Sequence, residues 1–354
     1  MHYRTVLHRF AGIIAVCLMS LTGCAASESS STVQSESSTA AHDIDLFAMD
    51  TYMNLRAYGD KADEALKAAS EKIQSLEHTL SVTEENSDIW KINNSGGEGA
   101  EVSEDTITLI KAAKEYGAAT DGALDITVYP VLKEWGFTTG EYRIPSEARI
   151  EELLKKVDYT QIDVSGTSVG IPDEVQIDLG ALAKGYTGDK VMEELRSRGV
   201  ESAIISLGGN VQALGTKPDG SPWSVAVVDP YTPGTDMCIV KVSGKAVITS
   251  GNYERYFTGE DGKDYWHIID PADGYPADNG IVSATIISDS GLMCDALSTA
   301  LFALGTEKAE EYWRAHGGFE MILVTDDKRI LYTEGISDTF SNISAMPAEV
   351  ITGD

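Results

Sequence analysis

One segment of the sequence places a lysine among small residues at the expected start of a helix, a pattern suited to phosphate binding. Residues 177–186 read IDLGALAKGY, and we expect a strand to end at Asp178 and a helix to begin near Gly180. The free N–H groups and positive dipole end of such a helix attract an anion, and Lys184 would add a point charge. Gly180 and Gly185 would allow close backbone approach. A tight turn with a surface lysine explains the segment equally well.

A second candidate is a pair of oxygen donors on an apolar helix. Asp295 and Thr299 are four residues apart in the run MCDALSTA at 293–300, so they share one helix face. Carboxylate and hydroxyl oxygens suit Mg²⁺. Because a buried carboxylate without a partner is costly, we favour a metal ligand over a solvated aspartate at this position.

A third candidate is a histidine that could move a proton. His267 is one of four histidines outside the first ten residues, and it opens the segment HIIDPADG at 267–274. An imidazole with a pKa near ~6.5 can act as general base at neutral pH. We expect a strand over 266–269 that ends at a turn. A histidine hydrogen-bonded inside that strand is an equally good interpretation.

Composition and absent motifs exclude several classes of protein. The chain has 354 residues, of which 42% are apolar, so a core can form. Acidic residues number 56 against 27 basic ones, a net charge of −29, and this balance excludes nucleic acid as a partner. Four cysteines without a CxxC pair support neither a zinc site nor a disulfide scaffold. The phosphate-loop, dinucleotide, serine-hydrolase and zinc-protease motifs are absent.

The N-terminus has the features of a lipoprotein signal. Arg4 and Arg9 precede an apolar run at 10–21 that is too short to span a bilayer, and LTGC at 21–24 resembles a lipobox. We expect a signal peptide over 1–23, a lipidated Cys24 with a flexible Ser/Thr-rich tether over 24–42, and a folded domain over 43–354. The protein would then sit on the extracytoplasmic face of a bacterial membrane. An ordinary signal peptide with an incidental cysteine is the alternative.

Mixed helical and strand patterns must position the candidate residues. The apolar spacing predicts an α+β unit without internal repeats. Cys238 and Cys294 remain in the folded part, and their pairing is open. We expect helices over 61–80, from 104 onward, 146–157, 180–198, 292–304 and 307–316. We expect strands over 161–164, 168–171, 175–178, 203–207, 223–228, 246–249, 266–269, 282–287, 319–324 and 329–333.

Taken in order, eight segments resemble the ApbE family, the FAD:protein FMN transferases. The resemblance runs from residue 49 to 304 and implies a T-fold-like (ApbE-type) α+β fold, a single large unit with two subdomains that hold FAD between them. The segments are MDT (49–51), LS with SD (80–81, 87–88), GALDITVYPVLKEWGF (122–137), DLGALAKGYTGD (178–189), LGGN (207–210), TSGNYERYF (249–257), HIIDPADG (267–274) and DALSTALFALG (295–305).

The resemblance also implies the site residues. FAD, the substrate, would be lined by Met49, Ala123, Leu124, Asp125, Asp178, Lys184 and Ile269. Mg²⁺ would be held by the Ala181 carbonyl, Asp295 and Thr299, with Ser298 nearby. His267 is the candidate for accepting the proton of the attacking hydroxyl, and Asp270 or another acid could serve instead.

The implied reaction is Mg²⁺-dependent transfer of FMN from FAD to a threonine or serine hydroxyl of a partner flavoprotein. A phosphoester bond forms and AMP leaves. The acceptor would be a subunit of an electron-transfer complex or an extracellular FMN-binding protein. Two alternatives stay open: an FAD pyrophosphatase that makes FMN and AMP, and a non-catalytic flavin-binding lipoprotein.

Four positions depart from the residues usual in the family. Asp50 replaces a glycine, Thr83 a tyrosine, Leu124 a phenylalanine and Asp273 a threonine. The metal and phosphate positions are intact, so the departures concern the flavin ring more than the reaction.

Overall fold

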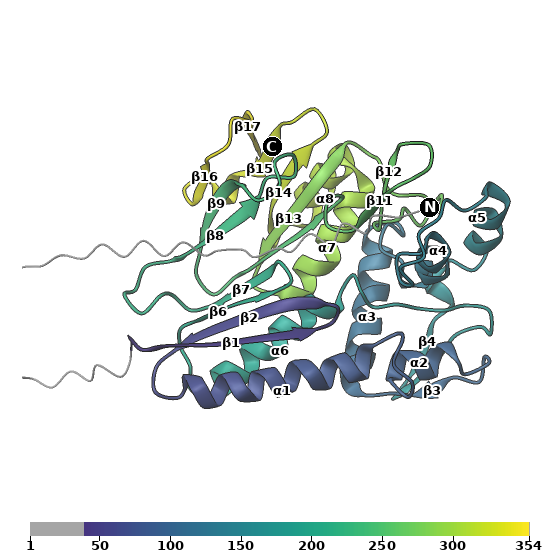
Figure 1. The fold of residues 1–354 in the computed structure, drawn as a ribbon, viewed down its shortest axis with the longest axis horizontal. Coiled ribbons are helices and arrows are strands. Elements are labelled where there is room, and N and C mark those ends of the chain that lie inside the picture. Colours follow the sequence, from purple (N-terminus) through teal and green to yellow (C-terminus); the bar gives the residue numbers. More distant parts are fainter. Residues whose placement is uncertain (1–38, 354) are drawn as a thin grey trace, which may run out of the picture.

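A nine-stranded sheet forms the centre of the fold (Figure 1). The computed structural model describes residues 39–353. Neighbouring strands are antiparallel except the last pair, which is parallel. The strand order across the sheet is β1 (Ala41–Ala48), β2 (Thr51–Tyr58), β6 (Ala203–Leu207), β7 (Asn210–Leu214), β10 (Ala246–Gly251), β13 (Ile281–Ser288), β14 (Glu320–Thr325), β15 (Ile330–Thr333) and β17 (Ala348–Ile351).

Four helices pack on one face of this sheet, and a small sheet covers part of the other. The helices are α1 (Ala62–Leu80), α6 (Ala183–Ser197), α7 (Gly291–Leu304) and α8 (Thr306–His316). The three-stranded sheet consists of β16 (Phe340–Asn342), β9 (Asp236–Val242) and β8 (Trp223–Val228), and it shares one apolar core with the larger sheet. α7 is buried on most sides because it is apolar along nearly its whole length.

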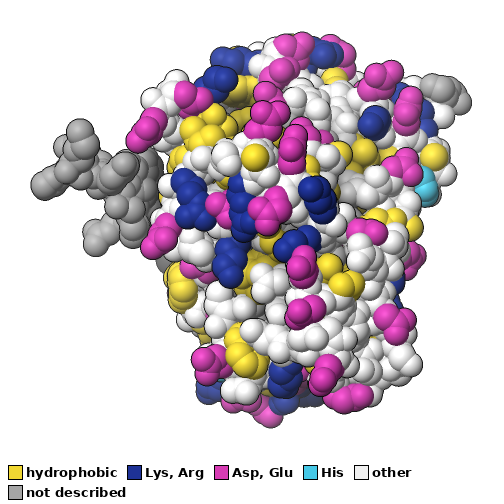
Figure 2. Space-filling model, turned by 90° about the vertical axis from the view of Figure 1, so that its right-hand side faces the viewer, with side chains coloured by type: hydrophobic (Ala, Val, Ile, Leu, Met, Phe, Trp, Pro, Cys, Tyr) yellow, Lys and Arg dark blue, Asp and Glu magenta, His cyan; other side chains and the backbone are white. Residues whose placement is uncertain are grey.

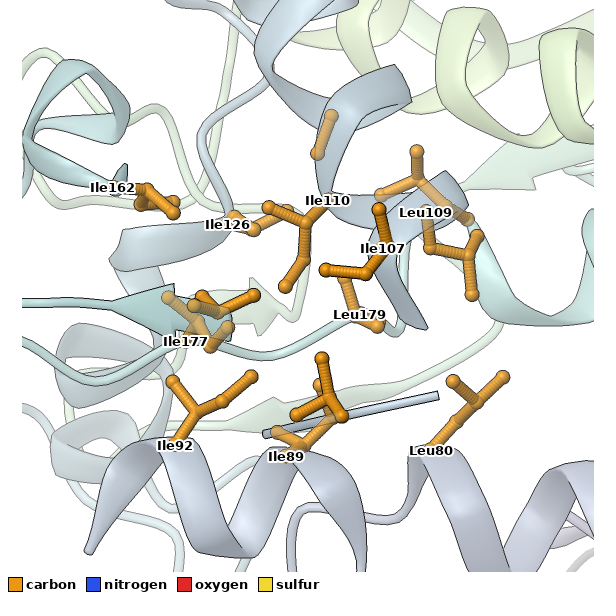
Figure 3. Close-up of a cluster of buried hydrophobic side chains, with 14 of the residues drawn as sticks. Leu80, Ile89, Ile92, Ile107, Leu109, Ile110, Ile126, Ile162, Ile177 and Leu179 are labelled. Carbon is orange, nitrogen blue, oxygen red and sulfur yellow. The ribbon is translucent and has the colours of Figure 1, made fainter. Parts of the chain in front are cut away.

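The remaining elements lie at one end of the helical layer. They are α2 (Asp88–Asn93), α3 (Glu104–Ala119), α4 (Tyr129–Trp135), α5 (Glu147–Leu154), the short strands β3 (Ala100–Glu101), β4 (Asp163–Ser165) and β5 (Ser168–Gly170), two 3₁₀ turns (Ile126–Val128 and Tyr159–Gln161), and the hairpin of β11 (Tyr256–Thr258) and β12 (Asp264–Trp266). A further 3₁₀ turn, Glu334–Ile336, packs instead in the apolar core that the nine-stranded sheet shares with the β16–β9–β8 sheet. Isoleucines and leucines from α2, α3 and the loop at 177–179 meet in the core that Figure 3 shows. Ala296 and Ala300 of α7 join the same core, which fixes α7 against this end of the molecule.

Most predicted elements are confirmed, and the mixed α+β class with them. The helix expected from residue 104 onward is α3, and Ser103 caps it, since the Ser103 side chain accepts a hydrogen bond from the Thr106 amide. The notable additions are the β1–β2 hairpin, α4 and strands β7, β9, β16 and β17, whose apolar residues follow no clear period in the sequence. β1 begins at Ala41, slightly before the predicted start of the folded part near Asp43.

Two predicted strands near the candidate site are wrong. Residues 175–178 form no strand, because the Ile177 amide and carbonyl bond the side chain of Asn93 at 2.8 Å each and not a neighbouring strand. α6 therefore begins at Ala183 after a turn and not directly behind a strand. The expected strand at 266–269 is also displaced, so His267 lies in a bend after β12.

The structure shows whether the two cysteines of the folded part pair, but it does not describe the predicted N-terminal signal. Cys238 and Cys294 are both buried and free. The predicted signal peptide, Cys24 and nearly all of the tether lie outside the described residues. Within residues 39–353, no helix combines the length and apolar character needed to cross a bilayer.

Candidate functional site

The candidate site is built where helices α6 and α7 cross at very close range. Gly185 of α6 faces Gly291 of α7, and a Cβ atom on Gly185 would collide with the Gly291 carbonyl and with Asp295 Cβ. A Cβ on Gly291 would likewise press into Gly185 and Gln212. Two glycines thus let one turn of α7, with Asp295, lie directly against the first turn of α6.

Asp295 is a buried carboxylate whose two oxygens are held by different elements. Its side chain is 3% exposed. Oδ2 accepts a hydrogen bond from the Gly185 amide at 2.8 Å, and Oδ1 accepts one from Asn210 Nδ2 at 2.9 Å. Lys184 Nζ lies 3.9 Å from Oδ1. The partner that the sequence required for this carboxylate is therefore a set of three donors from α6 and the start of β7.

The donor set around Asp295 fits Mg²⁺ shared with a phosphate, not a closed metal cage. In a regular helix the Gly185 amide would donate to the carbonyl of Ala181, four residues earlier. Here it donates to Asp295, so the Ala181 carbonyl does not accept that hydrogen bond. Thr299 Oγ1 is partly exposed and lies 3.3 Å from Ser250 Oγ, which also contacts Ser298 Oγ at 2.8 Å. One carboxylate, one hydroxyl and one carbonyl are hard oxygen donors. Among residues 39–353, no cluster of three acidic, histidine or cysteine side chains could hold a metal by itself.

The turn before α6 carries Asp178, which is linked to the same charges. Asp178 Oδ1 accepts a hydrogen bond from the Gly180 amide at 2.8 Å. Loss of hydration raises the pKa of the Asp178 carboxyl. The hydrogen bond from the Gly180 amide and the positive charges of Arg255 and Lys184 oppose that rise. The predicted phosphate segment thus presents one cation, Lys184, between two carboxylates.

Glu254 and Arg255 also lie at this site, and the sequence assigned neither of them a role. Glu254 is reached by solvent yet surrounded by protein, and the resulting loss of hydration raises its pKa to about 7. Asp295 adds to this rise, whereas Lys184 and Arg255 oppose it. The only signal in the sequence was the pair of opposite charges within TSGNYERYF. Where these side chains lie depends on where β10 ends, and the sequence did not predict that point.

His267 lies beside these groups with its ring held by the backbone. Nδ1 is 3.3 Å from the Arg255 carbonyl, and the His267 amide donates to the same carbonyl at 3.1 Å. If Nδ1 carries the proton, Nε2 is free to accept one. Loss of hydration and the charges of Arg255 and Lys184 lower the pKa of His267 to about 3, so the ring is neutral at physiological pH.

The turn between β1 and β2 closes the site from another side. Met49 and Asp50 occupy it with φ angles of 49° and 58°. The Met49 amide donates to Glu77 Oε1 at 2.6 Å, and Met49 Sδ is 3.7 Å from Thr187 Oγ1 of α6. Asp50, where the family usually has glycine, forms an ion pair with Arg255 at 3.0 Å.

Four predicted residues have side chains engaged elsewhere in the fold. Asp125 is buried and bonds Thr127 and the Tyr159 amide, and Leu124 is buried in the apolar core that also contains Leu109 and Ile126. Ile269 packs in a separate apolar cluster, and Asp270 caps its own turn by accepting from the Ala272 amide at 2.9 Å.

Ala123 is partly buried against the core beneath α7. The structure therefore gathers Met49, Asp178, Ala181, Lys184, His267, Asp295 and Thr299, and it assigns the other predicted side chains contacts within the protein.

A basic hollow near α4 and α5 shares no residue with this site. It measures about 270 Å³ and is lined by residues of α4, α5 and nearby loops. Figure 2 shows Lys and Arg side chains gathered beside acidic ones on one face of the molecule. Arg143 and Arg149 both pair with Glu134, and Lys156 pairs with Glu174. The basic side chains there are largely neutralised by their neighbours.

Comparisons with known proteins show the family and the fold of the chain. The ApbE family model matches residues 49–323. An FAD:protein FMN transferase of Treponema pallidum is 32% identical over 81% of this chain and 85% of that protein. One from Klebsiella pneumoniae is 34% identical over 76% and 85%. The crystal structure of the ApbE protein of Thermotoga maritima superimposes with a TM-score of 0.80 at 34% identity, covering 85% of this chain and 99% of that one. The apo flavinyl transferase ApbE of Pseudomonas stutzeri gives 0.72 at 29% identity, covering 81% and 91%.

Proposed function

The chain belongs to the ApbE family, and on this premise we propose that it transfers FMN from FAD to a hydroxyl of a partner protein at the α6–α7 crossing. The observation that carries the proposal is the position of Asp295. It is a buried carboxylate held by Gly185 and Asn210, and it lies 3.9 Å from the one lysine of the predicted phosphate segment.

The proposed reaction breaks the phosphoanhydride bond of FAD and forms a phosphoester bond to the acceptor. The acceptor oxygen, from threonine or serine, forms a bond to the phosphorus on the FMN side of FAD. The bond between that phosphorus and the bridging oxygen breaks, and AMP leaves with that oxygen. The hydroxyl proton passes to a base of the protein. Such a transfer depends mainly on positioning and neutralisation of charge.

The residues at the crossing can supply that neutralisation. Lys184 would bind the pyrophosphate oxygens. Asp295, Thr299 and the Ala181 carbonyl would hold Mg²⁺ together with the same phosphate group. When bound, the ion would act as a Lewis acid on the phosphoryl oxygens. Asn210 and Gly185 keep the Asp295 carboxylate oriented toward Lys184.

Two side chains are placed to accept the proton. His267 was the candidate from the sequence, and its neutral ring has Nε2 free when Nδ1 donates to Arg255. Its pKa of about 3 makes it a weak base, however, whereas Glu254, with a pKa of about 7, matches the working pH. Glu254 is therefore the second candidate beside His267, whose ring is held by the Arg255 carbonyl, and Asp270, whose carboxylate accepts from the Ala272 amide, is left outside the reaction.

The location of the enzyme is proposed from its N-terminal sequence. The lipobox-like LTGC and the tether support a lipid anchor at Cys24 on the extracytoplasmic side of a bacterial membrane. Its acceptor would then be a flavoprotein of the membrane or of the extracytoplasmic space.

The proposal is tested by incubating residues 39–354 with FAD, with or without Mg²⁺ and an acceptor domain, and following AMP by chromatography. We expect AMP and covalently bound flavin to appear in equal amounts, only with Mg²⁺ and acceptor. AMP without labelled acceptor would instead identify a pyrophosphatase. Intact FAD with tight binding would identify a flavin-binding protein without turnover.

A further inference from the structure

The outer face of the β1–β2 hairpin changes character at its tip. Along most of its length, cross-strand pairs on this face are polar. Arg56 Nε bonds Asp43 at 2.6 Å, and Asn54 Nδ2 bonds Asp45 at 2.8 Å. The last outward pair before the turn is Phe47 with Tyr52, and these rings are 71% and 61% exposed.

These two aromatic residues, the tip pair, lie next to the candidate site. The turn that joins them contains Met49 and Asp50, and Asp50 is ion-paired to Arg255 at 3.0 Å. Tyr256, the next residue after Arg255, is 50% exposed. Exposed aromatic residues are thus near both partners of this ion pair in the chain: the tip pair two residues from the turn that contains Asp50, and Tyr256 directly after Arg255. Phe47 and Tyr52 are two residues from the turn, a distance of about 7 Å along a strand.

The hairpin also presents an open strand edge at this place. β1 is the terminal strand of the nine-stranded sheet, and within residues 39–353 no strand pairs with its outer edge. An open edge can accept an extended segment by main-chain hydrogen bonds, with side-chain contacts giving selectivity. Natural proteins usually protect such edges with charge, and β1 has acidic residues along its length but an aromatic ring at the site end.

We propose that the tip pair and Tyr256 dock the acceptor polypeptide, in an extended conformation, around the residue that receives FMN. The inference rests on the proposed function, because a transferase must hold a protein hydroxyl at the phosphate for in-line attack. A segment that lies on the tip pair reaches the site within two to four residues by crossing the Met49–Asp50 turn. Aromatic rings are the side chains that contribute most at such contacts.

An alternative explanation is purely structural, because aromatic cross-strand pairs stabilise hairpins. The two explanations differ in what they alter. Loss of a structural pair lowers thermal stability, and it does not act selectively on the acceptor. Loss of a docking surface raises the KM for acceptor and leaves the KM for FAD unchanged.

The test uses the double variant Phe47→Ser/Tyr52→Ser, the single variant Tyr256→Ser and the control Ile343→Ser. Ile343 is 54% exposed and directly follows β16, a strand of the separate three-stranded sheet, so it is not part of the β1–β2 hairpin. The probe is the flavin-free form of a domain that naturally carries FMN on threonine. Its binding is measured with the threonine changed to alanine, and its labelling with the threonine intact. We expect both site variants to weaken binding and to raise the acceptor KM at least tenfold, with FAD binding unchanged.

The outcomes separate this inference from the proposed function. If both site variants bind and label the acceptor domain as the wild type does, the docking surface is wrong and the transferase proposal stands. Weakened binding without any labelling by the wild type supports the docking surface and refutes the transferase. If the site variants lose binding to lipid vesicles but not to the acceptor domain, the rings contact a membrane and the inference is wrong.

Discussion

Replacement of Asp295 by asparagine tests the metal-binding account most sharply. The change keeps the shape of the side chain and removes its charge. One oxygen becomes an amide NH₂, which faces either the Gly185 amide or Asn210. Each hydrogen bond to a charged group contributes about 1.5–3 kcal/mol, so we expect unfolding free energy to fall by about that amount.

The effect on catalysis should be larger than the effect on stability. Loss of a residue that merely orients a metal ligand costs about 10–100-fold in metal affinity. Loss of a ligand itself should therefore raise the Mg²⁺ concentration for half-maximal rate by at least about 100-fold. The assay is the initial rate of AMP release as a function of Mg²⁺, at saturating FAD and acceptor.

Asp189 provides a matched control on the same helix pair. Its carboxylate accepts hydrogen bonds from the Gly291 and Leu292 amides at 2.6 and 2.9 Å, and so caps α7. Asp189→Asn should lose comparable stability, yet its Mg²⁺ requirement should stay within about threefold of wild type, well below the 10–100-fold cost of a disturbed metal ligand. Equal Mg²⁺ curves for Asp295→Asn and wild type would refute the assignment of Asp295 as a metal ligand.

Three further predictions follow from the site and the core. Gly185→Ala should lower the free energy of unfolding by about 1–3 kcal/mol in denaturant, because the new Cβ collides with Gly291 although alanine favours helices. Gly170→Ala, whose Cβ has room, is the control, and equal stability of the two variants would contradict the close crossing. The plot of kcat/KM for acceptor against pH should rise through about 7 as Glu254 loses its proton, and Glu254→Gln should abolish this limb; a limb that survives in the variant would assign it to another group. Burial raises the pKa of Cys238 and Cys294 to about 12, so neither thiol should react with a disulfide reagent at neutral pH until the domain unfolds, and rapid labelling of the native domain would contradict their burial.

The sequence was a good guide where local spacing determines structure. The apolar spacing of α1 and the serine cap of α3 depend on neighbours in the chain, and both elements form where expected. Asp295 and Thr299 are on α7 as predicted, one turn apart, and the need of the buried carboxylate for a partner could be stated in advance.

Partners distant in the sequence could not be predicted from it. The Asn210 amide that bonds Asp295 is 85 residues away, and the Asn93 side chain that replaces a strand partner at Ile177 is 84 residues away. The β1–β2 turn uses Met49 and Asp50 at positive φ, where Asn-Gly or Asp-Gly is the usual signal. Glu77 and Arg255 hold that turn from elsewhere in the chain, so no local pattern marks it.

The most direct test of the central claim is the intact mass of a threonine-bearing acceptor domain after incubation with the enzyme, FAD and Mg²⁺. We predict a mass increase of one FMN less one water, confined to the threonine, and its loss with Asp295→Asn but not with Asp189→Asn. An acceptor of unchanged mass, in a reaction where FAD is nevertheless split into FMN and AMP, would contradict transfer and leave hydrolysis as the activity of this site.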